Sequence, residues 1–190
     1  MRTFAALAAV CCLALLGGCA SPASDPLAPK TAGNVSLKRY QGTWYELARL
    51  PMAHQDACAQ SEAHYNLKPD GSFDVLNRCR TLGDEWLRAQ GHANVQASGH
   101  TDKLWVEFDN SLSRLLPGVT RAEYWILYVD ERYRTAIVGS PDRKHLWILS
   151  RAQHLSAWER ESLLAKARQQ GYDTTRLIWR MADRNIAKMH

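Results

Sequence analysis

Cysteines are the most reactive side chains in this chain, and there are five of them in 190 residues. A cysteine thiolate can bind a metal, act as a nucleophile or pair into a disulfide. Cys11 and Cys12 lie in an apolar N-terminal run, Cys19 follows that run, and Cys58 and Cys79 lie in the body of the chain. No CxxC pair occurs. A Cys/His metal site is therefore the less favoured role for Cys58 and Cys79, and we expect no bound metal.

The first thirty residues have the character of an export and anchoring signal. Phe4–Leu16 is an apolar run after a basic Arg2, and it is too short to cross a bilayer as a helix. It ends in Leu16-Gly17-Gly18-Cys19, which resembles a lipobox, the cleavage motif whose cysteine receives lipid in bacterial lipoproteins. We expect a signal peptide over 1–18, a lipidated Cys19, and a tether over 19–33 that is rich in Pro, Ala and Ser.

The residue after the expected lipidated cysteine indicates the membrane to which the protein is sorted. Ala20 rather than Asp follows Cys19, which by resemblance to sorted bacterial lipoproteins favours the outer membrane. The folded domain, 34–190, would then lie in the periplasm. In that oxidising compartment the simplest use of Cys58 and Cys79 is a disulfide. It would close a loop of about 20 residues and stabilise the fold by about 3 kcal/mol on a chain-entropy estimate.

The composition is typical of one globular domain. Hydrophobic residues make up 46% and charged residues 23% of the chain, close to globular averages, and this length suits a single domain. The net charge of +5 comes from bases interspersed with acids, so nucleic acid is not an expected partner. The sequence contains no nucleophile elbow, HExxH, phosphate loop or dinucleotide-binding glycine pattern, which argues against an enzyme.

From residue 37 onward, short alternating runs of aromatic and β-branched residues are separated by turn residues such as Pro69-Asp70-Gly71. This pattern is typical of an antiparallel sandwich or barrel. It predicts eight strands, which are Thr43–Leu50, Ser61–Lys68, Ser72–Cys79, Trp86–Gln96, Lys103–Asp109, Glu123–Asp130, Tyr133–Ser140 and His145–Arg151.

One later segment predicts a helix. Ser156 and Glu159 form a capping box, and Gly171 stands at the expected C-terminus. A last apolar run, Arg176–Met181, would return as an edge strand. The helix face expected to lie on the sheet comprises Ala157, Leu163, Leu164 and Ala167.

Closing an eight-stranded meander into a barrel removes the exposed strand edges. The predicted fold class is therefore all-β: an eight-stranded antiparallel up-and-down β-barrel with one C-terminal α-helix packed on the outside. Eight strands leave an interior just wide enough for one small ligand. Alternation of side chains along the second and third strands places Ala63, Tyr65, Phe73, Val75 and Asn77 inside.

Three motifs in order along the chain resemble the lipocalin family. Gly42-Thr43-Trp44-Tyr45-Glu46 matches the Gly-x-Trp-Tyr signature, and Val129-Asp130-Glu131-Arg132-Tyr133 matches the Thr-Asp-x-x-Tyr region with Val in place of Thr. Leu146-Trp147-Ile148-Leu149-Ser150-Arg151 matches the strand that ends in an arginine before the helix. Together with the lipobox, they resemble the bacterial outer-membrane branch of the family, which is related to apolipoprotein D.

The resemblance implies structural roles for five residues. Trp44 would plug the closed end of the barrel, with Arg151 over its ring in a cation–π contact. Gly42 would allow the tight turn into the first strand, and Asp130 and Tyr133 would shape a hairpin at the closed end.

Ligand contacts are expected instead from inward positions in the middle and the open end of the barrel. Alternation, combined with the strand positions of the family, selects Ala63, Tyr65, Phe73, Val75, Asn77, Val106, Phe108, Tyr124 and Trp147. The same residue types also fill ordinary cores, so for each residue singly core packing is an equal alternative.

A cavity with aromatic and aliphatic walls favours a long apolar ligand, because each buried methylene contributes about 0.8 kcal/mol. The resemblance implies a membrane-anchored carrier that stores or transports fatty acids or lysophospholipids in the bacterial envelope, with no catalysis and no cofactor. Arg114 and Arg121 would be able to meet an acidic or phosphate head group, although a solvated side chain is the simpler interpretation of each.

Two other function classes remain open. A lipid-modifying enzyme of lipocalin type with a cysteine nucleophile would need a free, reactive thiol at Cys58 or Cys79. An envelope adaptor, or a homodimer, would bind a protein partner through the open rim or the loop 110–119. That loop carries the apolar residues Leu112, Leu115, Leu116 and Pro117.

Overall fold

A computed structural model describes residues 28–109 and 121–189. The expected signal peptide, the lipidation site Cys19, most of the tether, Arg114 and the apolar residues of the loop 110–119 lie outside the described residues. Within the part that is described, no helix has both the length and the apolar character needed to cross a bilayer.

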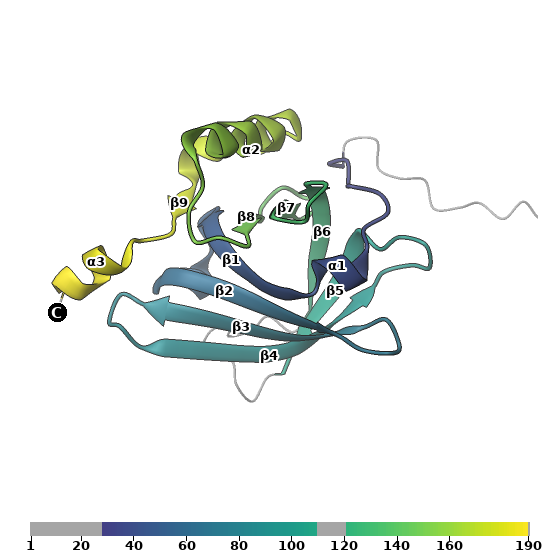
Figure 1. The fold of residues 1–190 in the computed structure, drawn as a ribbon, viewed down its shortest axis with the longest axis horizontal. Coiled ribbons are helices and arrows are strands. Elements are labelled where there is room, and N and C mark those ends of the chain that lie inside the picture. The colour runs from purple at the N-terminus through teal and green to yellow at the C-terminus, as the bar shows by residue number, and fades with distance from the viewer. Residues whose placement is uncertain (1–27, 110–120, 190) are drawn as a thin grey trace, which may run out of the picture.

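The first eight strands form one antiparallel meander in which each pairs with the next along the chain (Figure 1). Pairing between the first two strands and between the first and the eighth closes the sheet into a barrel. The eight barrel strands are β1 (Gly42–Arg49), β2 (Cys58–Leu67), β3 (Phe73–Thr81), β4 (Trp86–Val95), β5 (Lys103–Phe108), β6 (Arg121–Val129), β7 (Thr135–Gly139) and β8 (Leu146–Ser150). The predicted all-β class and closed barrel are confirmed.

Several predicted limits are wrong at the ends of strands. Tyr133 does not begin β7: it has φ +57° and lies in a turn, and its backbone N–H donates to the Asp130 carbonyl at 2.8 Å. β2 begins at Cys58, earlier than predicted, because this end of the strand pairs with β3 around the cysteines. The expected edge strand is reduced to β9 (Ile178–Trp179), which pairs with Ala48 and Arg49 of β1.

The structure also contains short helical segments that the sequence pattern did not predict. Such segments are too short to show a helical period. They are α1 (Leu37–Tyr40), α3 (Asp183–Ile186) and the 3-10 turns η1 (Ala53–Gln55), η3 (Thr174–Arg176) and η4 (Ala187–Met189).

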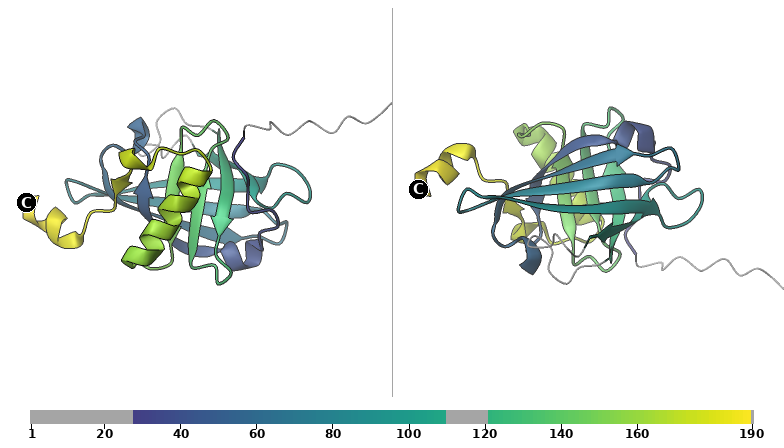
Figure 2. Two further views of the ribbon diagram at one scale, coloured as in Figure 1. Left: turned by 90° about the horizontal axis from the view of Figure 1, so that it is seen from above. Right: turned by 90° about the horizontal axis from the view of Figure 1, so that it is seen from below.

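The predicted helix is α2 (Ala157–Gln169), and it lies outside the barrel (Figures 1 and 2). Its capping box forms as expected, with the Ser156 hydroxyl accepting from the Glu159 N–H. Leu163, Leu164 and Ala167 are buried against the outward-facing apolar residues of β6 to β8 and β1. Ala157 was expected on this face but is exposed, and the buried residues of the helix begin at Leu163.

The closed end of the barrel is built around Trp44, which is fully buried. The Arg151 guanidinium lies 3.8 Å from the centre of the Trp44 ring, and it donates to the Thr43 carbonyl at 2.6 Å and the Tyr40 carbonyl at 3.0 Å. Gly42 has φ +93°, and a Cβ there would lie 3.3 Å from a nitrogen of Arg151. The geometry is therefore that expected for a plug held by an arginine.

The β6–β7 hairpin at the same end is organised by one carboxylate. Oδ1 of Asp130 accepts from the backbone N–H groups of Arg134 and Thr135, each at 2.6 Å. The Tyr133 hydroxyl in turn accepts from the Ser36 N–H at 2.8 Å, which ties the hairpin to the segment before α1.

A disulfide joins Cys58 of β2 to Cys79 of β3, with the two Cα atoms 5.5 Å apart. Both cysteines are buried. The predicted pairing is confirmed, and a cysteine nucleophile at either position is excluded because neither sulfur is a free thiol.

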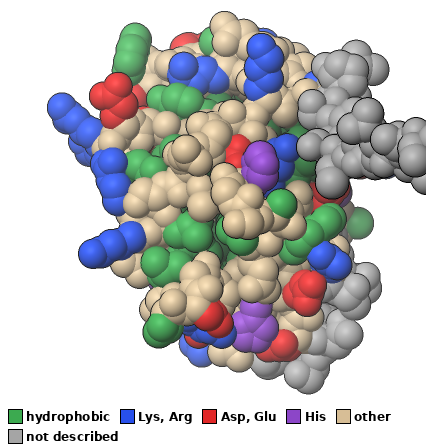
Figure 3. All heavy atoms as spheres, turned by 90° about the vertical axis from the view of Figure 1, so that its right-hand side faces the viewer, with side chains coloured by type: hydrophobic (Ala, Val, Ile, Leu, Met, Phe, Trp, Pro, Cys, Tyr) green, Lys and Arg blue, Asp and Glu red, His purple; other side chains and the backbone are tan. Residues whose placement is uncertain are grey.

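One face of the molecule shows the interspersed charges expected from the sequence. Figure 3 shows basic, acidic and hydrophobic side chains mixed on one face. Charges of one sign do not gather over that face.

Candidate functional site

The barrel interior holds a cavity of about 590 Å³, a size within the roughly 300–1,000 Å³ that is typical of small-molecule sites. It lies between the closed end, sealed by Trp44, and the end where the β1–β2 and β7–β8 connections lie. We call this second end the mouth, and at it the cavity is lined by Gln55, Ser140, Asp142 and His145.

Eight of the nine residues predicted to contact ligand line this cavity, and they come from five different strands. They are Ala63, Tyr65, Val75, Asn77, Val106, Phe108, Tyr124 and Trp147. Phe73 does not line it: this side chain is fully buried in the core, with its ring edge-on to Tyr65 at 5.7 Å between centroids. Whether the eight bind a ligand stays a prediction.

Three tyrosine hydroxyls meet where the cavity gives way to the closed end. The Tyr65 hydroxyl donates to that of Tyr124 at 3.0 Å, and the hydroxyls of Tyr40 and Tyr124 share a hydrogen bond of 2.8 Å. Burial raises the pKa of Tyr65 to about 12 and raises those of Tyr40 and Tyr124 well above the ordinary tyrosine value. The three therefore stay neutral near pH 7 and give the cavity an uncharged polar floor.

Tyr40 was missed by the sequence analysis because it comes from α1 and not from a barrel strand. The one indication in the sequence was its position four residues before Trp44 of the signature motif. In the structure the Trp44 indole N–H donates to the Tyr40 carbonyl at 2.8 Å. The two rings also contact each other, with centroids 4.9 Å apart.

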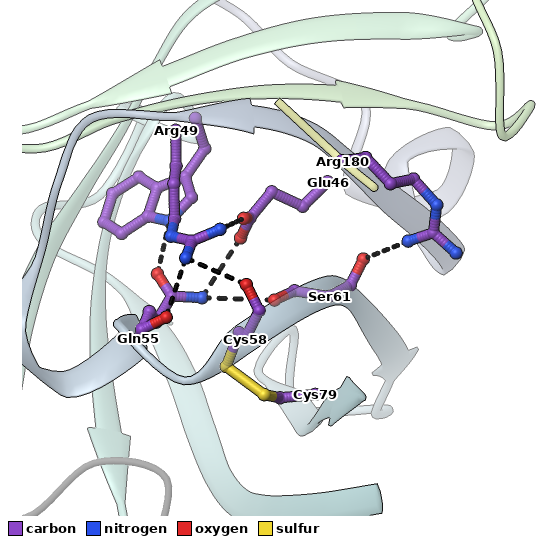
Figure 4. Close-up of polar contacts among 8 residues, drawn as sticks. Glu46, Arg49, Gln55, Cys58, Ser61, Cys79 and Arg180 are labelled. Carbon is purple, nitrogen blue, oxygen red and sulfur yellow. Dashed lines mark hydrogen bonds and ion pairs between the residues drawn. A yellow bond between two sulfur atoms is a disulfide. The ribbon is translucent and has the colours of Figure 1, made fainter. Parts of the chain in front are cut away.

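A buried polar network lies at the mouth. β1 shifts register against β8 between Glu46 and Ala48, and such a bulge lets side chains three residues apart share a face. The guanidinium of Arg49 thus donates to the Glu46 carboxylate at 3.1 Å, and the amide of Gln55 donates to its other oxygen at 3.1 Å. Figure 4 shows Arg49 and Gln55 converging on Glu46.

The same network is tied to both neighbouring elements. Arg49 also donates to the carbonyls of Gln55 at 2.7 Å and Cys58 at 3.1 Å, and the Trp147 indole donates to the Gln55 side-chain oxygen at 3.2 Å. Burial raises the pKa of the Glu46 carboxyl above its ordinary value, although Arg49 and Gln55 oppose the shift. The sequence analysis missed this network, although Glu46 stands two residues after Trp44 and so faces inward by alternation.

One cavity-lining group has an unused acceptor. Oδ1 of Asn77 is buried and accepts no hydrogen bond from the protein, and a buried polar atom left without a partner costs free energy. Arg121, the described one of the two predicted head-group arginines, lines the mouth but forms an ion pair with Glu107 at 3.4 Å. The lining residue Arg78 also has a buried Nε without a partner, so the cavity wall holds one unpaired acceptor and one unpaired donor.

Metal chemistry finds no support in the described residues. Across 28–109 and 121–189, no group of three or more His, Cys, Asp or Glu side chains is placed to hold a metal ion. The site is a cavity whose lining combines aromatic and aliphatic side chains with polar and charged ones, an arrangement suited to binding an amphipathic molecule.

Comparison with known proteins agrees with the barrel and the signature residues. The model of a lipocalin-like domain matches residues 35–182. The chain belongs to the lipocalin family. This lipocalin is 33% identical over 180 residues to the outer membrane lipoprotein Blc of Citrobacter freundii. The matched region covers 94% of this chain and 97% of that protein. It is 33% identical over 145 residues to temperature-induced lipocalin-1 of Arabidopsis thaliana, covering 75% and 77% of the two chains.

Solved structures show the same fold at lower identity. Insecticyanin from the tobacco hornworm superposes with a TM-score of 0.65 at 19% identity, covering 84% of this lipocalin and 86% of that chain. Lobster apocrustacyanin A1 superposes with a TM-score of 0.60 at 16% identity, covering 81% and 89%. At these identities the likeness concerns the barrel alone.

Proposed function

We propose that this lipocalin is a membrane-anchored carrier of single-chain lipids, fatty acids or lysophospholipids, and that it catalyses no reaction. The observation that carries the proposal is the 590 Å³ cavity, whose lining combines aromatic and aliphatic side chains from five strands with polar and charged ones. Burying a chain of ten or more methylenes at about 0.8 kcal/mol each would offset the entropy lost on binding and leave at least micromolar affinity.

The polar atoms of the cavity bear on the head group. After a small side-chain movement, the unpaired acceptor of Asn77 and the unpaired Nε donor of Arg78 would both gain partners from a head group with a hydroxyl donor beside a phosphate, and a lysophospholipid has both. An ionised fatty acid lacks such a donor, and a carboxylate would also approach the buried Glu46, which lines the same cavity. Among single-chain lipids we therefore expect lysophospholipids to bind more tightly than fatty acids of equal chain length.

We place the protein at the outer membrane, held by lipid on Cys19, with the barrel in the periplasm. Two features support this location. The lipobox-like Leu16-Gly17-Gly18-Cys19 stands at the end of the apolar leader, and the relatives from Citrobacter freundii and Escherichia coli are named outer membrane lipoproteins.

The binding proposal is tested by native mass spectrometry and by titration with lipids of graded chain length. The protein is the chain from residue 19 with Cys19→Ser, which keeps every described residue and avoids detergent. We expect one lipid per chain, with affinity rising by up to about fourfold per added methylene until the cavity is filled. No binding at any chain length would contradict the proposal.

A pair of variants on β2 shows whether the lipid occupies the barrel. Ala63 lines the cavity, whereas Asn66, on the same strand, is exposed on the outer face. Ala63→Trp fills the cavity and should lower affinity by at least about tenfold, which is the loss of roughly two buried methylenes. Asn66→Trp adds the same bulk outside and should leave affinity unchanged, so equal effects would place the lipid elsewhere.

A further inference from the structure

We infer that the anchor holds this lipocalin with the mouth of its barrel against the bilayer, so that lipid enters the cavity directly from the membrane surface. The inference rests on the proposed function, because it assumes a lipidated Cys19. It concerns the direction in which the chain leaves the barrel, which the location of the anchor alone does not determine.

The segment before α1 runs back along the outside of the barrel and is fixed at four places. The Val35 N–H donates to the Thr101 hydroxyl at 2.9 Å and the Gly33 N–H to the Asp102 carboxylate at 3.0 Å, both beside the β4–β5 turn. The two remaining bonds are from the N–H of Ala32 to the carbonyl of Ile126 at 2.9 Å and from that of Lys30 to Oε1 of Gln170 at 2.8 Å. We call residues 28–35 the strap.

The strap starts at the mouth. Gln170 follows the last turn of α2, and its carbonyl accepts from Arg143 in the β7–β8 turn at 2.7 Å. That turn includes Ser140 and Asp142, which line the cavity. In the left view of Figure 2, the start of the strap and the β7–β8 turn lie at one edge of the molecule, and α1 lies at the opposite edge.

The chain between the strap and the anchor keeps the start of the strap near the bilayer. Nine peptide units separate Cys19 from Ala28, and fully extended they reach about 30 Å. A chain leaving at α1 would hold the closed end toward the bilayer. A chain leaving beside the β7–β8 turn holds the mouth there instead.

The opposite side of the mouth carries side chains suited to an interface between water and lipid. Leu82 in the β3–β4 turn and Trp86 at the start of β4 are 39% and 41% exposed, and the Leu82 N–H donates to the Ala57 carbonyl beside η1 at 3.0 Å. The Arg78 guanidinium lies 4.4 Å from the centre of the Trp86 ring. An exposed tryptophan beside a cation is a common arrangement at the level of lipid head groups.

The orientation is tested on the full lipidated chain in vesicles of phosphatidylethanolamine and phosphatidylglycerol that carry a nitroxide on the lipid head group. A fluorophore is attached through Lys144→Cys in the β7–β8 turn or through Arg132→Cys in the β6–β7 turn. Both are exposed basic residues of hairpin turns. β7 has five residues, which separates the two turns by about 17 Å.

We expect the head-group quencher to act several-fold more strongly on the label at position 144 than on the label at 132. A Gly/Ser stretch of about 20 residues, inserted between Ala20 and Ala28, should abolish the difference because the barrel then turns freely. Equal quenching without the insertion, or stronger quenching at 132, would overturn the orientation.

The design separates this inference from the function on which it rests. If the Cys19→Ser chain binds lipid and the lipidated chain floats with vesicles, equal quenching refutes the orientation alone. If the lipidated chain does not float, the anchor is refuted and the orientation with it. Direct entry of lipid from the membrane also predicts a difference in rate. The anchored protein should take up lysophospholipid from vesicles faster than the Cys19→Ser chain does.

Discussion

Replacing Arg151 by methionine would remove the clamp at the closed end of the barrel. The guanidinium covers the Trp44 ring and donates to several backbone carbonyls around it, including those of Thr43, Gln41 and Tyr133. A hydrogen bond from a charged donor contributes about 1.5–3 kcal/mol, and the cation–π contact about 0.5–2 kcal/mol. Arg151 is partly exposed, so water replaces some of the lost bonds. We expect Arg151→Met to lower the free energy of unfolding by about 3 kcal/mol.

The assay is urea unfolding of the Cys19→Ser chain, followed by tryptophan fluorescence and by far-ultraviolet circular dichroism. The midpoint should fall with no change in the dependence on urea, and the melting temperature should fall by about 6–12 °C. Arg132→Met is the matched control, because Arg132 is exposed at the same end of the barrel. It should change stability by less than about 0.5 kcal/mol. If Arg151→Met is as stable as this control, the closed end is held by packing alone and our account of the arginine is wrong.

Further predictions concern the disulfide, two titrating groups and the head group. Cys58→Ser combined with Cys79→Ser should lower the free energy of unfolding by about 3 kcal/mol in urea denaturation, the chain-entropy value for this loop. Burial raises the pKa of Glu46 in the folded state, so its protonation stabilises the fold in acid. Unfolding measurements should show this contribution being lost as pH rises from the unfolded value through the raised one, and Glu46→Gln should remove that pH dependence. In an alkaline absorbance titration, Tyr65 should ionise only near its pKa of about 12, and Tyr65→Phe should remove one such late step. Asn77→Leu should weaken lysophospholipid binding by about 2- to 12-fold and leave fatty acid binding unchanged; equal losses for both ligands would exclude the head-group contact.

The barrel itself was predictable because its signals are local. Alternation between apolar and polar residues marks a strand wherever one face is buried, and a two-residue period is enough to place Ala63, Tyr65 and Val75 on the inner face. The capping box at Ser156 is likewise contained within four residues. Phe73 shares the alternation but lies below the cavity floor, because a period gives the face of a strand and not the depth along the barrel.

The sequence by itself therefore determined the strands, the single long helix, the cysteine pair and the inward-facing part of the cavity wall on five strands. The tertiary structure decided what depends on contacts between distant segments. The bulge that turns Glu46 and Arg49 toward each other arises from pairing with β8, and Tyr40 reaches Tyr124 only because α1 folds under the barrel. The path of the strap toward the mouth is set by bonds to Thr101 and Gln170. Such contacts join residues far apart in the chain, and the local preferences of each segment do not specify them.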